Sequence, residues 1–305
     1  MNPTRSRLAL FLLLTRPWFL LGPTLLYALG LAVARYLGEI LHVGLAVEGL
    51  LMVLALQLAV HYLNEYADAE ADATNPNRTW FSGGSGALGA GGLPRSTALQ
   101  AAIVSLTFLA LLATTMLIRG ETPVLAWAVF ALTFPLAYFY SAPPLRLVAS
   151  GYGEFIAALI VSALVPTFAY ALQTGAMHRI LFIATVPLVL FNFAMILAFE
   201  VPDYGTDLKF RKRTLMVRIG WDAGMRLHDV AVVAGCLALL LGILLDIPGR
   251  VTLGLLIVLP LAAAQVWQMG RIRRGARPNW RLLCGGAVAL YALAAYLTFA
   301  GFAAS

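Results

Sequence analysis

Residues 50–72 read LLMVLALQLAVHYLNEYADAEAD, an apolar run that ends in four acids within nine residues. The apolar segment to which this run belongs, at roughly 41–66, is long enough to cross the about 30 Å of hydrocarbon in a bilayer as a helix. Acid clusters are unusual at the end of such a segment, because carboxylates are costly to bury in apolar surroundings. The stretch therefore predicts a spanning helix that presents carboxylates at one membrane surface.

The composition excludes a soluble protein. Of the 305 residues, 61% are hydrophobic and 11% are charged, whereas a soluble domain has about 25% charged residues. The apolar runs are continuous, which favours helices over the alternating strands of a barrel. The net charge of +7 is explained by lysines and arginines in loops at one membrane surface, so nucleic acid is not an expected partner. Cys236 and Cys284 lie within apolar runs and are expected to be small buried side chains.

We expect an all-α polytopic membrane protein with nine transmembrane helices around a central cavity, as a single domain over residues 1–305. The N-terminus is basic and then apolar, as in a signal peptide. Its apolar region is too long for one and is interrupted at Arg16-Pro17, which favours a first spanning helix. The expected spans are 17–36, 41–66, 97–118, 122–140, 153–172, 179–201, 223–246, 250–270 and 282–303.

The basic residues predict an orientation. With the N-terminus in the cytoplasm, 17 of the 21 lysines and arginines fall on the cytoplasmic side, beginning with Arg5. This asymmetry follows the positive-inside rule. The longer loops, at about 67–96, 202–222 and 271–281, lie on the same side. We therefore expect a multi-pass protein of the cell (inner) membrane, with the cavity and the active site open to the cytoplasm.

Asn64, Asp68 and Asp72 are spaced four residues apart, which on a helix places them in one stripe about 12 Å long. Glu65 and Glu70 point elsewhere and are expected to matter least. Like charges four residues apart destabilise a helix, and a divalent cation would turn this repulsion into coordination. A lone cluster of this kind at a membrane edge is usually a solvated helix end, so the interpretation depends on a second cluster.

The second cluster follows the segment at 179–201. Asp203 and Asp207 repeat the four-residue spacing, with Glu200 about one turn earlier, and Pro202 is expected to start a new helical turn. A basic run comes directly afterwards, comprising Lys209, Arg211, Lys212 and Arg213. Acids beside bases suit a diphosphate that is bound through Mg²⁺. Two such clusters at one membrane face favour a functional site.

Two further features are less specific. The loop after the fourth segment contains Tyr140 and Arg146, which alone describe a loop with an arginine that reaches toward the interface. The glycine-rich residues 83–92 are more typical of a lid or hinge than of a phosphate cradle. Arg78, which lies between this run and the acids, is the better candidate for a phosphate ligand.

With these motifs the chain resembles the UbiA superfamily of intramembrane aromatic prenyltransferases. The resemblance covers nearly the whole chain and rests on N-x-x-x-D-x-x-x-D at 64–72, D-x-x-x-D at 203–207, and YSAPPLR at 140–146 with the G-x-G-E that follows. TRPW at 15–18 and PDYGTD…KRTLMVRIG at 202–220 look most like the branch that prenylates 1,4-dihydroxy-2-naphthoate for menaquinone biosynthesis.

The resemblance implies a Mg²⁺-dependent transfer from an allylic polyprenyl diphosphate to a small aromatic acceptor, at the lipid bilayer. Two Mg²⁺ ions would be held with the diphosphate by Asn64, Asp68, Asp72, Asp203, Asp207 and Glu200. Of these, the four aspartates would be the catalytic residues. Arg78, Lys209 and Lys212 would contact the diphosphate, and Arg146 would be a further substrate-binding residue. Tyr66, Tyr140 and Tyr204 would form an aromatic wall around the allylic cation.

The acceptor stays open at this stage. Arg211 stands where the naphthoate branch often has glycine, and no lysine follows Tyr140 where some relatives have one. Within the same fold the acceptor could be 4-hydroxybenzoate, homogentisate, a chlorin or a glycerophosphate lipid. A transporter would instead carry its acids near the bilayer midplane on broken helices. A non-catalytic lipid-binding relative would keep the fold without the reaction.

Overall fold

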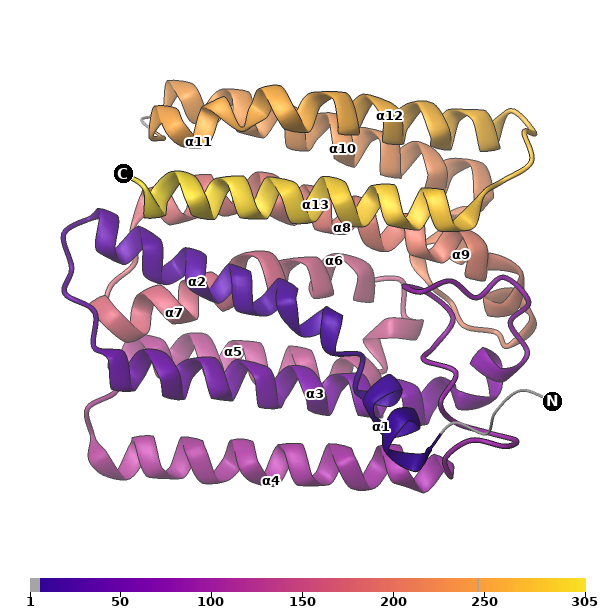
Figure 1. Cartoon of the computed structure of the whole chain (residues 1–305), viewed down its shortest axis with the longest axis horizontal. Coiled ribbons are helices and arrows are strands. Elements are labelled where there is room, and N and C mark those ends of the chain that lie inside the picture. Colours follow the sequence, from indigo (N-terminus) through magenta and orange to yellow (C-terminus); the bar gives the residue numbers. More distant parts are fainter. Residues whose placement is uncertain (1–5, 246) are drawn as a thin grey trace.

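The computed structural model describes residues 6–245 and 247–305, which form a bundle of long helices with alternating directions (Figure 1). Over these residues, nine helical segments are long and apolar enough to span a membrane, which confirms the predicted all-α polytopic class. The helices of these segments are α1 (Arg7–Thr15) with α2 (Leu21–Tyr36), α3 (Val43–Ala73), α4 (Arg95–Arg119), α5 (Val124–Ser141), α6 (Gly153–Leu159) with α7 (Val165–Thr174), α8 (Arg179–Lys209), α10 (Trp221–Leu244), α11 (Gly249–Leu253) with α12 (Leu255–Arg273), and α13 (Trp280–Ala303). Arg5 and the last residue of the predicted 223–246 segment lie outside the described residues.

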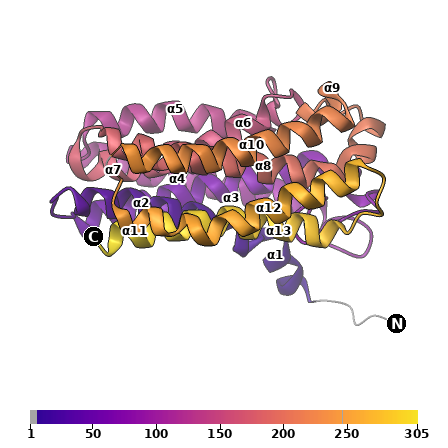
Figure 2. The ribbon, with the colours of Figure 1, turned by 90° about the horizontal axis from the view of Figure 1, so that it is seen from above.

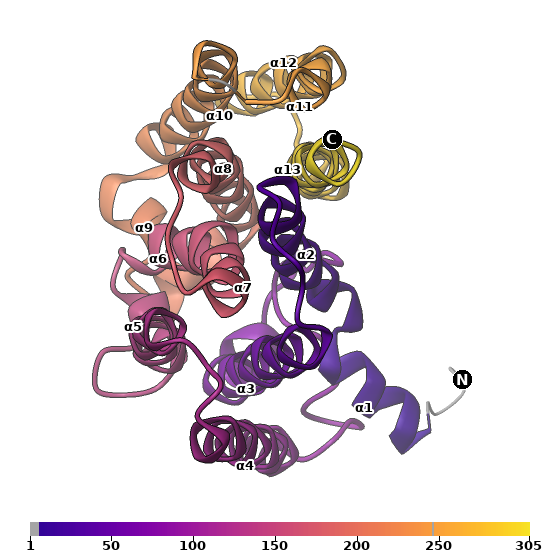
Figure 3. The same ribbon diagram turned by 90° about the vertical axis from the view of Figure 1, so that its left-hand side faces the viewer.

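Part of the bundle forms a ring in which each element contacts the next: α2, α3, α5, the α6–α7 pair, α8 and α13. Figure 3 shows this ring end-on, with α4 outside α3 and with α10 and α12 on the far side of α8 and α13. Figure 2 shows α1 projecting from the bundle near the end that carries the short helix α9 (Leu215–Ile219). The long loop between α3 and α4 lies at this same end (Figure 1).

Both acid motifs lie on helices that extend beyond the predicted spans. α3 continues to Ala73, and α8 continues through Pro202 to Lys209, so the prediction that Pro202 starts a new helical turn was wrong. A proline has no backbone N–H, so it cannot donate the helical hydrogen bond to the carbonyl oxygen four residues earlier. Here the buried thiol of Cys284 on α13 donates a weak hydrogen bond to that carbonyl, at Ala198, over 3.8 Å. The neighbouring helix thus compensates for the missing bond, and α8 carries its motif without a break.

The N-terminal apolar region is interrupted directly before the first predicted span, 17–36. α1 ends at Thr15, Arg16 adopts a φ of +48°, and a 3₁₀ turn at Pro17–Leu20 leads into α2. Pro17 has no N–H with which to continue the helix, which explains the position of the break. As a result Arg16 and Phe19 both face the interior of the ring.

A buried polar triad links three elements of the ring within the membrane. Asn192 on α8 donates to the hydroxyl of Ser162 over 2.9 Å, and the hydroxyls of Ser162 and Tyr291 are 2.8 Å apart. Ser162 lies in a π-helical turn between α6 and α7, and Tyr291 lies on α13. Interhelical hydrogen bonds of this kind hold membrane helices together, because lipid tails provide no competing partners.

α2 and α7 approach each other closely at Gly30. A Cβ at this position would lie 2.2 Å from the carbonyl oxygen of Pro166 and 2.8 Å from the Cβ of Ala169. Small residues allow membrane helices to pack at such short range. This contact fixes α2 against α7 on one side of the ring.

Gly30→Ala should therefore destabilise the protein by about 1–3 kcal/mol, the usual cost of overpacking. Thermal unfolding in detergent measures the effect. Gly22→Ala on the same helix is the matched control, because a Cβ there would meet no atom within 4 Å, and it should not lower stability. A Gly30→Ala protein that unfolds at the parental temperature would contradict the close approach of the two helices.

Candidate active site

A cavity of about 560 Å³ lies between the ring helices, and the charged side chains that line it lie at one end. The polar end receives residues of both acid motifs, Asn64, Asp68, Asp72, Glu200, Asp203 and Asp207. The opposite part is lined by apolar side chains that include Leu26, Val53, Phe130 and Phe168. Such a cavity suits a ligand with a charged head and an apolar tail.

α3 presents its motif to the cavity from one helical face. The hydroxyl of Ser141, at the end of α5, donates to Oδ1 of Asn64 over 3.3 Å. Asp68 is buried, with 6% of its surface exposed. Asp72 lies against the glycine-rich loop, where a Cβ at Gly84 would be 2.3 Å from the carboxylate oxygen Oδ2. Gly84 also has a positive φ, so glycine is required there both by conformation and by space.

α8 supplies the facing carboxylates. The amide of Asn75, in the loop after α3, donates to Oδ1 of Asp203 over 2.7 Å. Asp207 is buried and lies 3.5 Å from the hydroxyl of Thr214. Glu200 also faces the cavity, and its Oε2 accepts a hydrogen bond from the backbone N–H of Met216 in α9 over 3.4 Å. One oxygen of this predicted metal ligand is thus engaged in holding α9.

Lys212 connects the two motifs. It lies in the turn after α8, and its ammonium is 2.8 Å from Asp68 on α3. Arg211 has a φ of +55°, and this left-handed residue turns the chain so that Lys212 points into the cavity. Burial alone would lower the pKa of Lys212, but the carboxylates of Asp68 and Asp207 raise it above its ordinary value. The ammonium therefore stays charged throughout the physiological pH range.

The loop after α5 brings a second cation to the same carboxylate. The guanidinium of Arg146 is 3.6 Å from Asp68. Tyr140 lines the cavity beside it. Glu154, at the start of α6, is buried and accepts a hydrogen bond from the backbone N–H of Leu215 over 2.7 Å. Glu154 thus supports α9 and, through it, the turn that carries Lys212.

Two of the predicted phosphate contacts lie outside the cavity. Arg78 donates from its guanidinium to the carbonyl oxygens of Gly83 and Asp72, so it shapes the glycine-rich loop. Lys209 is exposed, and its ammonium lies 5.4 Å from the ring centre of Phe210. It follows Asp207 by two residues, which on a helix is nearly the opposite face. Their placement gives no support to a direct phosphate contact.

Two of the three predicted aromatic contacts also face away from the cavity. The guanidinium of Arg95 lies 4.2 Å from the ring centre of Tyr66. Tyr204 packs edge-on against Trp221, with ring centres 5.2 Å apart. Each tyrosine is close to an aspartate in sequence but is rotated away from it by the helical twist. Tyr140 alone of the three lines the cavity.

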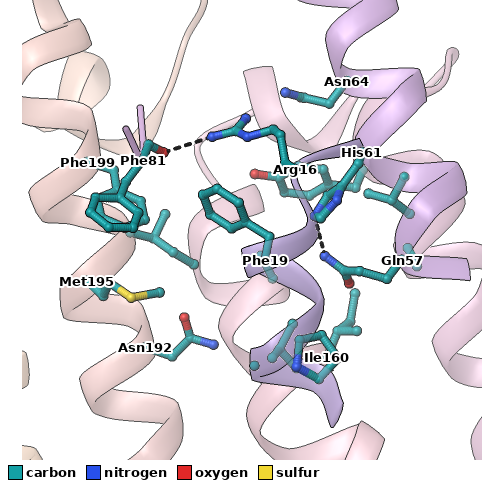
Figure 4. A pocket seen from close by; sticks show the side chains of 18 of the residues that line it. Arg16, Phe19, Gln57, His61, Asn64, Phe81, Ile160, Asn192, Met195 and Phe199 are labelled. Carbon is teal, nitrogen blue, oxygen red and sulfur yellow. Dashed lines mark hydrogen bonds between the residues drawn. The ribbon is translucent and has the colours of Figure 1, made fainter. Parts of the chain in front are cut away.

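Arg16 and Glu65 support the site, although neither was predicted from the sequence to contribute to it. The Arg16 guanidinium is 3.4 Å from Glu65. It also donates to the carbonyl oxygen of Phe81 over 3.2 Å (Figure 4). Glu65 is only 3% exposed and accepts hydrogen bonds from the backbone N–H and the hydroxyl of Ser85, over 2.7 and 2.6 Å. Glu65, one of the two acids that were expected to matter least, thus anchors the glycine-rich loop. The feature of the sequence that could have indicated a role for Arg16 is the interruption of the N-terminal apolar region at Arg16-Pro17.

Backbone strain is concentrated at this end of the molecule. Over the described residues, the non-glycine positions with positive φ are Arg16, Arg146 and Arg211. Arg16 approaches the buried Glu65, Arg146 approaches the buried Asp68, and Arg211 directs Lys212 to the same Asp68. A left-handed conformation costs a non-glycine residue about 1–2 kcal/mol and persists where the surroundings impose it, commonly at functional sites.

The donors at the polar end fit magnesium. They are carboxylate and amide oxygens, which are the ligands that this ion prefers. Among residues 6–245 and 247–305, no three acidic, histidine or cysteine side chains converge closely enough to form a metal site by themselves. Mg²⁺ commonly uses one or two carboxylates and completes its coordination with water and substrate phosphates. The separated carboxylates therefore suit an ion that is shared with a diphosphate.

Comparison with known proteins agrees with the sequence resemblance. A family model described as the UbiA prenyltransferase family matches residues 20–284. No curated protein sequence matches the chain.

Solved structures share the fold. A UbiA homolog from Archaeoglobus fulgidus bound to DMAPP and Mg²⁺ superimposes with a TM-score of 0.65 and 17% identity, over 96% of this chain and 98% of that chain. The Archaeoglobus fulgidus UbiA homolog bound to GPP and Mg²⁺ gives a TM-score of 0.62 and 16% identity, over 97% and 100% of the two chains. A digeranylgeranylglyceryl phosphate synthase gives 0.63 and 14%, over 99% and 100%.

Lys212→Met should leave Asp68 buried with only the more distant Arg146 as a counter-charge. Removal of one partner of a buried ion pair typically costs about 3–5 kcal/mol, and we expect a loss of about 3 kcal/mol because Arg146 remains. Adding Asp68→Asn should recover part of this loss, so a double-mutant cycle measured by unfolding in detergent should show coupling.

Lys209→Met is the matched control, because Lys209 is the neighbouring exposed lysine. It should change the free energy of unfolding by less than about 0.5 kcal/mol. Strictly additive effects of the Lys212 and Asp68 substitutions would contradict a coupled pair.

Proposed function

The chain belongs to the UbiA prenyltransferase family, and from this premise we propose that it transfers a polyprenyl group from an allylic polyprenyl diphosphate to an aromatic acceptor. One observation carries the proposal. The carboxylates of α3 and α8 share the polar end of a cavity with Lys212, and most of the side chains that line the rest of that cavity are apolar. The polar end fits a diphosphate, and the apolar part fits an isoprenoid tail. The complexes of the Archaeoglobus fulgidus homolog with DMAPP or GPP and Mg²⁺ support the same class of donor here.

The polar end has the charges that a departing diphosphate requires. We assign two Mg²⁺ ions to the residues of the two motifs, which are Asn64, Asp68 and Asp72 on α3 and Asp203, Asp207 and Glu200 on α8. Bound Mg²⁺ would supply Lewis-acid neutralisation of the diphosphate. Lys212 and Arg146 add positive charge that the protein fixes in place beside Asp68. Such preorganised charge acts on the oxygens that gain negative charge as the carbon–oxygen bond breaks.

The apolar part of the cavity has two tasks in this proposal. It holds the isoprenoid tail, and it keeps water from the allylic cation that the departing diphosphate leaves behind. An electron-rich carbon of the acceptor ring then bonds to the allylic carbon, and the ring loses a proton. With a naphthoate acceptor, the carboxyl group would also be lost, as carbon dioxide. The reaction thus needs the acceptor to approach at the boundary between the polar and apolar parts.

We propose 1,4-dihydroxy-2-naphthoate as the acceptor, which would place the protein in menaquinone biosynthesis. The support is the similarity of the stretches at 15–18 and 202–220 to that branch of the family. Both stretches contribute to the site, the first through Arg16 and the second through Asp203, Asp207 and Lys212. The same chemistry on 4-hydroxybenzoate or another acceptor is the alternative.

The chain is a multi-pass membrane protein, and we propose that the polar end of its cavity faces the cytoplasm from the cell (inner) membrane. The excess of lysine and arginine in the loops at that end supports this orientation. A reporter fused at the C-terminus should then be located on the opposite side of the membrane. A cytoplasmic C-terminus would contradict the orientation.

The decisive experiment supplies the purified protein with a labelled allylic polyprenyl diphosphate, Mg²⁺ and a panel of aromatic acceptors. We expect release of diphosphate and a prenylated product with 1,4-dihydroxy-2-naphthoate. A product with another acceptor alone would contradict the naphthoate assignment. No diphosphate release with any acceptor would contradict the proposed reaction.

Asp68→Asn and Asp203→Asn, one from each motif, should each lower the rate of diphosphate release by about 100-fold or more, because each removes negative charge that holds Mg²⁺ at the leaving group. Chelation of Mg²⁺ should abolish release by the parent protein. Glu70→Gln is the matched control, since this exposed acid of α3 lies outside the cavity, and its rate should be unchanged. Release that survives both aspartate substitutions would overturn the metal assignment.

A further inference from the structure

Three phenylalanines from distant parts of the sequence meet at the inner edge of the polar end. They are Phe19 before α2, Phe81 in the loop after α3 and Phe199 on α8, and all three line the cavity (Figure 4). The rings of Phe81 and Phe199 are stacked with centres 5.9 Å apart, and those of Phe19 and Phe81 meet edge-to-face at 6.3 Å. The three rings thus form one continuous aromatic wall.

This aromatic wall lies where the polar and apolar parts of the cavity meet. Phe199 precedes Asp203 by one helical turn, which places its ring on the same face of α8 and about 6 Å further into the membrane. Phe81 lies three residues before Gly84, which contacts Asp72. The wall is therefore next to the carboxylates, on the side from which the tail of a bound prenyl diphosphate would extend.

One ring of the wall already faces a cation. The guanidinium carbon of Arg16 lies 4.2 Å from the ring centre of Phe19. Aromatic faces attract cations through their quadrupole, and the attraction is strongest where water is excluded. Tyr66 and Tyr204, to which the family resemblance assigned this task, are turned toward Arg95 and Trp221 instead.

We propose that Phe19, Phe81 and Phe199 enclose the allylic cation and decide whether it is captured by the acceptor or by water. The inference rests on the proposed function and extends it to the fate of the intermediate. In the productive course, a ring carbon of the acceptor bonds to the allylic carbon and the ring loses a proton. In the competing course, the oxygen of water bonds to the same carbon and water loses a proton. The products are then a prenyl alcohol and free diphosphate.

Phe81 makes this protection dependent on the glycine-rich loop. Its ring is the only one of the three that lies in a loop, and that loop is fixed by the bonds from Ser85 to Glu65 and from Arg16 to the Phe81 carbonyl. The neighbouring Trp80 is 71% exposed and does not line the cavity. The two adjacent aromatic residues of one loop therefore allow a matched comparison.

The test measures how much of a labelled allylic diphosphate becomes prenylated acceptor and how much becomes prenyl alcohol. Phe81→Leu and Phe199→Leu should each slow transfer roughly 3- to 30-fold, the contribution expected of one cation–π contact. They should also raise the fraction of alcohol several-fold. Trp80→Leu should keep the parental fraction, and Phe81→Tyr, which retains the ring, should restore it.

The result that overturns the inference is a parental alcohol fraction in both leucine variants, even where total turnover falls, because a loss of packing alone slows both courses equally. Should one leucine variant fail to fold, the other decides the question alone. A parent protein that releases no diphosphate would instead overturn the proposed function, so the two failures are distinct.

Discussion

The active end of the molecule depends on the contact between Asp68 and Lys212. Four aspartates from α3 and α8 line one end of a cavity that is otherwise largely apolar, where charges without partners are strongly disfavoured. The ammonium at 2.8 Å from Asp68 offsets part of this cost and joins α3 to the turn after α8. The protein accepts backbone strain at Arg211 in order to aim that ammonium. The two motifs can therefore lie at one end of the cavity only when the ammonium of Lys212 is held beside Asp68.

Much of the fold and of the carboxylate site could be predicted from the sequence, because both depend on local patterns. The length of each apolar run defines a span, and the four-residue spacing places the aspartates on one helical face. The same helical geometry explains why residues close to the aspartates in sequence were wrongly expected to face the cavity. Tyr66 and Lys209 each lie two residues from an aspartate, which on a helix turns them to another side. Lys212 reaches the cavity only because Arg211 reverses the chain, and this conformation is not evident from the residue type.

The anchoring of the loop could not be predicted for a different reason. Arg16 meets Glu65 across 49 residues of sequence, and Ser85 meets it across 20. Glu65 follows Asn64 directly, so the helix turns it about 100° away from the face that carries Asn64, Asp68 and Asp72 and toward the loop. The glycine content of the loop indicated a lid or hinge. The sequence did not indicate that Glu65 holds the loop, because its contacts with Arg16 and Ser85 form only in the folded protein.

The loop has contacts with both parts of the cavity, and this links two requirements of the proposed reaction. Asn75 holds Asp203, Gly84 contacts Asp72, and Phe81 completes the aromatic wall. Ionisation of the donor requires charge at the carboxylates, whereas survival of the cation requires the exclusion of water. Because one loop contributes to both, a displacement that exposes the cation also disturbs the carboxylates that promote its formation. Ionisation should therefore be fastest in the same arrangement in which the cation is best protected.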